Sequence, residues 1–276
     1  MKHIFFDIDG TLLSGDNTVP KKTIVAIKKL KENGNKVYIC TGRTKGYVKL
    51  DCIKNLDFDG AIYGCGTHIV LGKEDLIFNS LSANEMEKIK KLLDINNTFC
   101  VFEGPDYLYM RYEEKLFHTD EKTKQEFISL LGTQDNFAFK LKSDLGPDLK
   151  DFDISYPNIT ANKFSIYTDT IEERDMLFSS WNDILSPISH NEKVHEIVPK
   201  GFSKGNAIRK ICSSIGCDIK DTISFGDSAN DIDMFRATNI SICMGSGFKI
   251  AKENASMVTT DFENGIYDAC KKMGLI

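Results

Sequence analysis

Short apolar segments alternate with amphipathic helical segments near the start of the chain, and this alternation limits the possible folds more than any other feature. The segments His3–Phe6, Lys36–Cys40 and Ala61–Tyr63 are rich in apolar residues and predict buried strands. Between them, apolar residues recur at helical spacing after Pro20, and a second helical stretch covers roughly Lys45–Asn55. Strands that alternate with helices are typical of a parallel sheet with crossover helices. The sequence therefore predicts an α/β fold with a Rossmann-like, three-layer core.

The same alternation returns in the last third of the chain, after a middle part of different character. Predicted strands lie at Val194–Val198, Thr222–Phe225, Ile240–Cys243 and Met257–Thr259, and predicted helices at Ser203–Ile215, Asp231–Ala237, Phe248–Glu253 and near the end. The middle part has helices at Ala83–Asn96, Glu121–Leu131 and Ile171–Trp181, a hairpin at Thr98–Met110 and a strand at Asn162–Tyr167. Residues 145–158 show no clear pattern. We therefore predict that residues 1–82 and 187–276 form the core and that residues 83–186 form an inserted α+β domain.

Two carboxylates stand at the end of the first predicted strand. Asp7 and Asp9 are followed by Gly10-Thr11, and extended backbone places residues i and i+2 on the same side. Adjacent carboxylates repel each other, so a cation or a shared proton is needed to keep them together. This arrangement suits a Mg²⁺ site in which one carboxylate attacks a substrate and the other transfers protons. An acidic strand end followed by an Asp-Gly turn is the structural alternative.

Three further polar segments follow predicted strands or begin predicted helices. Thr41-Gly42-Arg43 offers a hydroxyl and exposed amides to phosphate oxygens. Ser203-Lys204-Gly205 begins a helix, where free N–H groups, the helix dipole and the lysine favour an anion. Gly226-Asp227-Ser228-Ala229-Asn230-Asp231 places one carboxylate after a strand and another at the start of a helix. Each segment alone also fits a turn, an N-cap or a first-turn acid. Ligands of open parallel sheets, however, lie beyond the carboxyl ends of the strands, where these segments are expected to meet.

Together these segments carry a resemblance to a known family. Asp7-Ile8-Asp9-Gly10-Thr11, Thr41-Gly42-Arg43, Lys204-Gly205 and the segment from Gly226 to Asp231 resemble the four motifs of the haloacid dehalogenase-like (HAD) hydrolase superfamily. The long insertion resembles the type C2 cap of its Cof-type sugar-phosphatase branch. The likeness extends over the whole chain, including the tail from Asn254 to Ile266.

The resemblance implies a Mg²⁺-dependent phosphatase that acts on a small phosphorylated metabolite, with sugar phosphates as the leading class. Asp7 would be the nucleophile that forms an aspartyl phosphate, and Asp9 would be the general acid and base. The phosphoryl group would be bound by Thr41, Gly42, Lys204 and Asn230. Mg²⁺ would be held by Asp7, Asp227 and the backbone carbonyl of Asp9, with Asp231 close by or bound through water. Because every proposed ligand atom is oxygen, Mg²⁺ is favoured over zinc.

The sequence departs from the pattern of this branch at two positions. Tyr63-Gly64-Cys65-Gly66 stands where Asn-Gly is frequent, and Asp233 stands where proline is frequent. We expect the first to alter substrate contacts near the hinge of the cap and the second to lie on a helix surface. Candidate specificity residues in the cap are polar or aromatic, although each also suits a surface or core position: Tyr107, Tyr109, Arg111, His118 and Lys163.

Composition and charge disfavour several other classes of protein. The net charge is −5 without a long basic run, which disfavours nucleic-acid binding. No apolar stretch approaches the ~20 residues of a membrane span, and the start of the chain does not resemble a signal peptide. The eight cysteines form no Cys-x-x-Cys pair, so we expect reduced thiols rather than a zinc or redox site, in a cytoplasmic protein.

Two other functions remain compatible with the motifs. A phosphomutase would use the same aspartyl phosphate but pass the phosphoryl group to another sugar hydroxyl. A receiver-like signalling module also combines a parallel sheet with aspartates, a threonine and a lysine. Such modules are much shorter, however, and their acceptor is not on the first strand. The composition does not indicate an oligomeric state.

Overall fold

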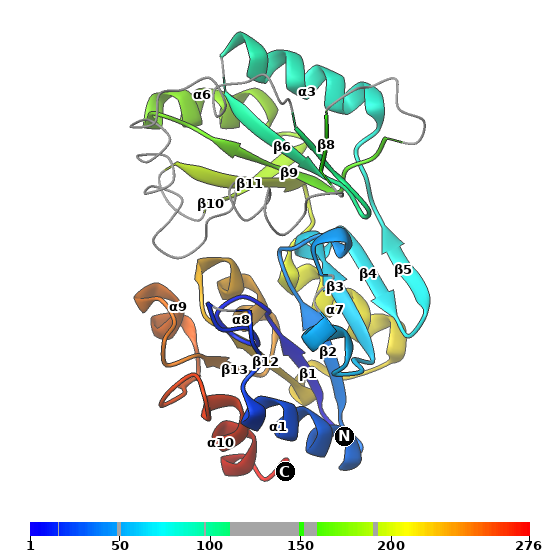
Figure 1. The fold of residues 1–276 in the computed structure, drawn as a ribbon, viewed down its shortest axis with the longest axis vertical. Coiled ribbons are helices and arrows are strands. Elements are labelled where there is room, and N and C mark those ends of the chain that lie inside the picture. Colours follow the sequence, from blue (N-terminus) through cyan, green and yellow to red (C-terminus); the bar gives the residue numbers. More distant parts are fainter. Residues whose placement is uncertain (16, 49–50, 97, 111–148, 152–158, 190–192) are drawn as a thin grey trace. The chain divides into compact units, whose positions relative to one another are not determined.

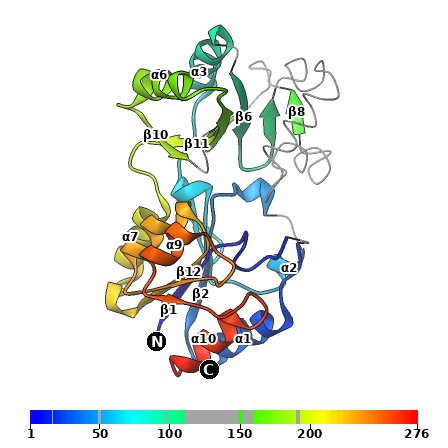
Figure 2. The same ribbon diagram turned by 90° about the vertical axis from the view of Figure 1, so that its left-hand side faces the viewer.

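The computed structural model describes all residues except 16, 49–50, 97, 111–148, 152–158 and 190–192 (Figures 1 and 2). The described chain divides into two compact units. The first comprises Met1–Arg43, Val48–Asn79 and Val198–Ile276, and the second comprises Thr44–Tyr47 and Ser80–Ile197. The chain therefore enters the second unit twice, briefly at Thr44–Tyr47 and then for Ser80–Ile197, before it returns to the first.

An eight-stranded sheet in the order β14–β13–β12–β1–β2–β3–β4–β5 forms the centre of the first unit. The strands from β14 to β3 pair in parallel, and β4 and β5 extend the sheet by antiparallel pairing. The strands are β1 (His3–Phe6), β2 (Lys36–Cys40), β3 (Gly60–Tyr63), β4 (His68–Leu71), β5 (Glu74–Phe78), β12 (Thr222–Gly226), β13 (Ile240–Cys243) and β14 (Met257–Val258). The helices are α1 (Lys21–Glu32), α2 (Asp51–Lys54), α7 (Lys204–Ile215), α8 (Ile232–Ala237), α9 (Lys249–Asn254) and α10 (Gly265–Lys272).

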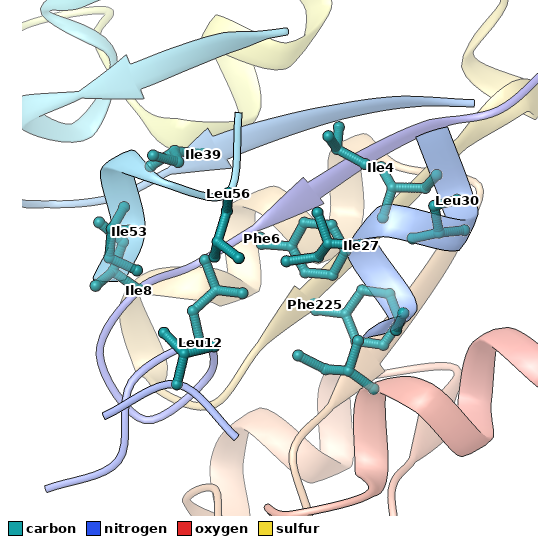
Figure 3. Packing of buried hydrophobic residues seen from close by; sticks show 14 of the residues in the cluster. Ile4, Phe6, Ile8, Leu12, Ile27, Leu30, Ile39, Ile53, Leu56 and Phe225 are labelled. Atoms are coloured by element: carbon teal, nitrogen blue, oxygen red, sulfur yellow. The ribbon is translucent and has the colours of Figure 1, made fainter. Parts of the chain in front are cut away.

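Helices cover both faces of this sheet, which makes the first unit a three-layer structure (Figures 1 and 2). On one face, Figure 3 shows Phe6 of β1 and Phe225 of β12 packed with Ile27 and Leu30 of α1, and α10 joins the same apolar cluster. On the other face, Phe5 belongs to a cluster with α7, α8 and α9. Phe5 and Phe6 are neighbours in the chain and point to opposite faces, as the alternation of a strand requires. The predicted α/β fold with a three-layer core is therefore confirmed.

The second unit contains a six-stranded sheet in the order β10–β11–β9–β6–β7–β8. Strand β9 pairs antiparallel with both β6 and β11, and β6 and β7 form the predicted hairpin. Helices α3 and α6 pack against one face through Met86, Leu93, Leu177 and Trp181. The elements are β6 (Phe99–Glu103), β7 (Leu108–Met110), β8 (Leu149–Asp151), β9 (Lys163–Tyr167), β10 (Leu185–Ser189), β11 (Val194–Pro199), α3 (Ala83–Ile95) and α6 (Ile171–Trp181). The insertion is thus of the α+β kind.

Some elements differ from their prediction. The hairpin of β4 and β5 has no clear sequence signal, because the side chains of β5 are mostly exposed and do not alternate. The stretch expected to form one helix from Lys45 is a short 3-10 turn and α2. The predicted domain division places residues 187–276 in the core, whereas β10 and β11 belong to the second sheet, because β11 pairs with β9.

The predicted helix at 121–131 lies outside the described residues, as does most of the stretch at 145–158. None of the eight cysteines, all of which lie in the described part of the chain, takes part in a disulfide bond. None of the described helices has both the length and the apolar character needed to cross a bilayer.

Candidate active site

The register between β1 and β12 brings the first and last motif segments together. Phe6 pairs with Phe225, and their rings stack with centroids 5.0 Å apart. Immediately after this pair, the Asp7 N–H donates to the Phe225 carbonyl at 2.9 Å. Burial of one phenylalanine side chain contributes about 1.5–3 kcal/mol, so a slipped register would cost much of the stabilisation from this pair. Asp7 and Asp227 consequently follow adjacent parallel strands at the same edge of the sheet.

Gly10 allows the loop after β1 to run close to Asp227. Its backbone is left-handed, with φ +71°, and a Cβ at this position would lie 2.4 Å from Oδ2 of Asp227. A side chain would therefore be strained by the backbone and would also collide with the carboxylate. Residue 10 must therefore be glycine for two reasons, the left-handed backbone of the turn and the short distance to the Asp227 carboxylate.

Lys204 connects the carboxylates of two motif segments. Its Nζ lies 2.7 Å from Oδ1 of Asp7 and 2.7 Å from Oδ1 of Asp231, and 3.3 Å from Oδ1 of Asn230. Asp7, Lys204 and Asp231 are 5%, 1% and 0% exposed. Although burial disfavours the ammonium form, Asp231 and Asp7 together hold the pKa of Lys204 well above its usual value. The lysine is therefore a fixed positive charge inside the site.

Asp231 also holds the backbone of its own loop. Its Oδ2 accepts hydrogen bonds from the N–H groups of Asp227 at 2.9 Å and Ser228 at 3.0 Å. The Ser228 hydroxyl donates to Oδ1 of Asn230 at 2.8 Å. The two oxygens of Asp231 thus have different partners, one the lysine and the other the loop that presents Asp227. This geometry makes Asp231 an organising residue of the site.

Three carboxylates of the site could together hold a metal ion. Asp7, Asp227 and Asp231 each offer one oxygen, and these oxygens all lie within 4.8 Å of one another. Burial, together with the neighbouring carboxylates, raises the pKa of Asp7 to about 8 and that of Asp227 to about 9. When all three carboxyl groups are deprotonated, they and the ammonium of Lys204 carry a net charge of −3 + 1 = −2, which a divalent cation would balance. An all-oxygen donor set with this charge fits Mg²⁺.

Asp9 is not one of these three carboxylates, and its side chain pairs with Arg43. The guanidinium of Arg43 donates from Nε to Oδ2 of Asp9 at 2.7 Å and from Nη2 to Oδ1 at 2.5 Å. Such a two-point contact fixes the orientation of a carboxylate as well as its position. The sequence motif includes Arg43, but its partner could not be identified from the sequence, because 34 positions separate the two residues.

Thr41 and Gly42 follow β2 next to the end of β1. Thr41 is 1% exposed, and its Oγ1 accepts from the Arg43 N–H at 3.1 Å. The carbonyls of Thr41 and Arg43 accept from the N–H groups of Cys65 and Gly64 at 3.1 and 2.8 Å. The segment Tyr63–Gly66, which departs from the pattern of the branch, therefore holds the Thr41–Arg43 loop through two backbone hydrogen bonds.

The start of α7 differs from the sequence prediction. The expected free N–H groups have protein partners: Gly205 donates to Oδ2 of Asp233 at 2.8 Å, and Asn206 donates to Oγ of Ser203 at 3.1 Å. These first-turn amides are thus already satisfied, and in this segment the Lys204 side chain is the group that faces the carboxylates. Asp233, which we expected on a helix surface, contacts the segment that carries Lys204.

The candidate residues of the second unit belong to its own packing. Lys163 is 1% exposed and pairs with Glu196 at 2.5 Å and Glu103 at 3.3 Å. Tyr109 is buried, whereas Tyr107 is 37% exposed. Arg111 and His118 lie outside the described residues.

Comparison with known proteins identifies the family. Residues 4–269 match the family model described as haloacid dehalogenase-like hydrolase. The chain is 27% identical to the Bacillus subtilis protein named "Putative phosphatase YkrA", covering 100% of this chain and 98% of the relative. It is 26% identical to 5-amino-6-(5-phospho-D-ribitylamino)uracil phosphatase YitU of Bacillus subtilis, covering 95% and 94%. Among solved structures, the HAD subclass IIB sugar phosphatase BT4131 is similar with a TM-score of 0.77 at 25% identity, with full coverage of both chains. The chain belongs to the haloacid dehalogenase-like hydrolases.

Proposed function

We propose that this hydrolase is a Mg²⁺-dependent phosphatase of a small phosphorylated metabolite and that it acts through an aspartyl phosphate on Asp7. The observation that supports this most strongly is the position of Lys204 between Asp7 and Asp231, at the end of the strand pair that also presents Asp227. A phosphoryl dianion cannot approach a bare carboxylate unless positive charge neutralises it. In this site the attacking carboxylate of Asp7 lies beside the ammonium of Lys204. The carboxylates of Asp227 and Asp231 lie close to Asp7 as well.

In the first half-reaction, a carboxylate oxygen of Asp7 attacks phosphorus. A bond between this oxygen and phosphorus forms, and the bond from phosphorus to the substrate oxygen breaks. Asp9 donates a proton to the departing alkoxide, which leaves as an alcohol. Asp9 therefore ends this half-reaction as a carboxylate, ready to act as a base.

In the second half-reaction, Asp9 takes a proton from a water molecule whose oxygen attacks phosphorus. The bond between phosphorus and Asp7 breaks, so inorganic phosphate leaves and both aspartates return to their starting states. Each oxygen of Asp9 accepts one hydrogen bond from Arg43, so the second lone pair of either oxygen would carry the proton that is transferred.

Lys204 would bind a phosphoryl oxygen while keeping its place beside Asp7, and Thr41, Gly42 and Asn230 would complete the phosphoryl site. Mg²⁺ would be held by Asp7, Asp227, the backbone carbonyl of Asp9 and Asp231, and when bound it supplies positive charge against the developing phosphoryl charge.

Sugar phosphates are the leading class of substrate. Of the similar proteins, YitU is named for a ribityl phosphate compound and BT4131 for sugar phosphates. Both names describe phosphate esters of polyhydroxylated carbon chains, whose alkoxide leaving groups need the proton that Asp9 would supply. The α+β insertion would act as a cap that contributes to the choice among such substrates.

The test is phosphate release from a panel of phosphomonoesters by the purified protein with Mg²⁺. Asp7→Asn is expected to abolish release, and Asp268→Asn, at an exposed position of α10, is the matched control. Ordinary activity of Asp7→Asn would overturn the mechanism. Interconversion of sugar phosphate isomers without phosphate release would instead indicate a phosphomutase, and a phosphorylated Asp7 that persists without turnover would indicate a receiver-like module.

A further inference from the structure

The first turns of α7 and α8 are joined by a contact directly beside the proposed active site. Oδ2 of Asp233 accepts a hydrogen bond from the Gly205 N–H at 2.8 Å. This N–H belongs to the peptide bond that follows Lys204, so the contact holds the backbone from which the Lys204 side chain extends. Asp233 comes two residues after Asp231, whose Oδ1 accepts from Lys204 Nζ at 2.7 Å. The same two segments are therefore linked twice, once through the side chain of Lys204 and once through its backbone.

The fit at the backbone contact is close. A Cβ on Gly205 would lie 2.5 Å from both the carbonyl oxygen and Oδ2 of Asp233. Glycine is thus required for α7 to approach α8 at this point. The N–H groups of a first helical turn have no acceptor within their own helix, so a carboxylate there forms a charge-assisted hydrogen bond and complements the helix dipole.

We propose that Asp233 is a positioning residue for Lys204. By holding the Lys204–Gly205 peptide, it fixes the point from which the ammonium reaches both Asp7 and Asp231. The lysine side chain is a flexible four-carbon stem, so its carboxylate partners restrain Nζ but not the backbone that carries it. The effect of Asp233 on catalysis rests on the proposed function, whereas its effect on Lys204 can be measured without any turnover.

The first experiment observes the Lys204 ammonium in the metal-free protein. With ¹⁵N-labelled lysine, an ammonium group that is buried and held by carboxylates exchanges its protons slowly and gives an NMR signal, which Lys204→Arg assigns. Asp233→Ala is expected to broaden or remove this signal, and Asp233→Asn is expected to retain it, because the amide oxygen can still accept from Gly205. Asp218→Ala is the matched control, since it removes a carboxylate that accepts a backbone N–H before β12, away from the site.

The second experiment measures phosphate release. Asp233→Ala is expected to lower kcat/KM about tenfold, because small displacements of a substrate-binding group are costly, and Asp233→Asn is expected to restore most of it. In a Lys204→Met background, Asp233→Ala should cause no further loss, since its effect passes through the lysine.

An unchanged Lys204 signal in Asp233→Ala would overturn the inference. An additive loss in the Lys204→Met background, or an equal loss in Asp233→Asn, would do the same. If the wild-type protein releases no phosphate from any ester, the proposed function fails, and the NMR comparison still decides whether Asp233 positions Lys204.

Discussion

Lys204 Nζ lies 2.7 Å from Oδ1 of Asp7, although 197 positions separate the two residues in the chain. The same ammonium lies 2.7 Å from Oδ1 of Asp231, and the three residues are at most 5% exposed. An isolated buried charge is strongly unfavourable, so each of these groups depends on the others. The lysine is therefore part of the structure of the site as well as a candidate ligand of the substrate.

Replacing Lys204 tests its role as a ligand of the substrate. Lys204→Met keeps the length of the side chain but removes the charge, so kcat/KM for phosphate release is expected to fall by about 10²–10³ with Mg²⁺ present, as for the loss of one preorganised donor. Steady-state kinetics measures the loss. Lys220→Met is the control, because Lys220 is an exposed lysine that is also paired with an aspartate. Activity of Lys204→Met within about threefold of wild type would contradict the role, since a lost charge-assisted hydrogen bond exceeds that factor.

The carboxylates predict an unusual dependence of stability on pH in the metal-free protein. Folding raises the pKa of Asp7 from 3.8 to about 8 and that of Asp227 from 3.8 to about 9, chiefly through burial. Across this window the folded protein binds more protons at these groups than the unfolded chain does, so the free energy of unfolding should fall as the pH rises. Thermal unfolding in EDTA from pH 5 to pH 9 measures the trend.

Mg²⁺ should oppose this trend, because it binds the deprotonated carboxylates and releases their protons. Its affinity is therefore expected to increase with pH, and a concentration about 100 times the dissociation constant would add about 2.7 kcal/mol of stability. In the double variant Asp7→Asn, Asp227→Asn, both the pH trend assigned to these residues and the response to Mg²⁺ should be lost. A wild-type protein whose metal-free stability rises between pH 5 and pH 9 would contradict this account.

The parts of the fold that could be predicted have strong local signals. The strands β1 and β2 contain apolar runs, β12 alternates polar and apolar residues, and a polar residue follows each of the three. Their parallel arrangement follows from the intervening helices. Because the carboxyl ends of parallel strands share one edge, Asp7, Thr41 and Asp227 could be expected in one region. By contrast, β5 is largely exposed at the end of the sheet, so its side chains carry no alternating pattern.

The pairing of side chains within the site could not be predicted, because contacts between loops decide it. Nothing in the local sequence indicates that Arg43 binds Asp9, or that Asp233 binds the N–H of Gly205 rather than facing solvent. A helix start in a sequence indicates unpaired amides but not which neighbour satisfies them. The same limit applies to Lys163, whose buried partners Glu103 and Glu196 come from two other strands.

The Arg43–Asp9 pair leads to a prediction about the leaving group. In Arg43→Lys, a single ammonium replaces the two-point contact, so Asp9 is less well oriented for proton transfer. We expect kcat/KM for alkyl phosphates, which reports the first half-reaction, to fall about tenfold, a part of the 10²–10⁴-fold that general acid–base catalysis contributes. For p-nitrophenyl phosphate the loss should be smaller, because its leaving group needs no proton. Arg236→Lys, at an exposed position of α8, is the control, and equal losses on both substrates would exclude this role for Arg43.

Two glycines in left-handed backbone allow the steric role of Gly10 to be separated from backbone strain. Gly10 has φ +71°, and a Cβ there would lie 2.4 Å from Oδ2 of Asp227, whereas Gly72 has φ +60° and no atom within 4 Å of such a Cβ. Both Gly→Ala variants should lose about 1–2 kcal/mol of stability from the left-handed conformation. Only Gly10→Ala displaces a proposed metal ligand, so calorimetric titration with Mg²⁺ should show binding at least about tenfold weaker in this variant alone, in the range known for altered ligand support. Equal Mg²⁺ affinity in the two variants would mean that the Gly10 loop does not set the position of the Asp227 carboxylate.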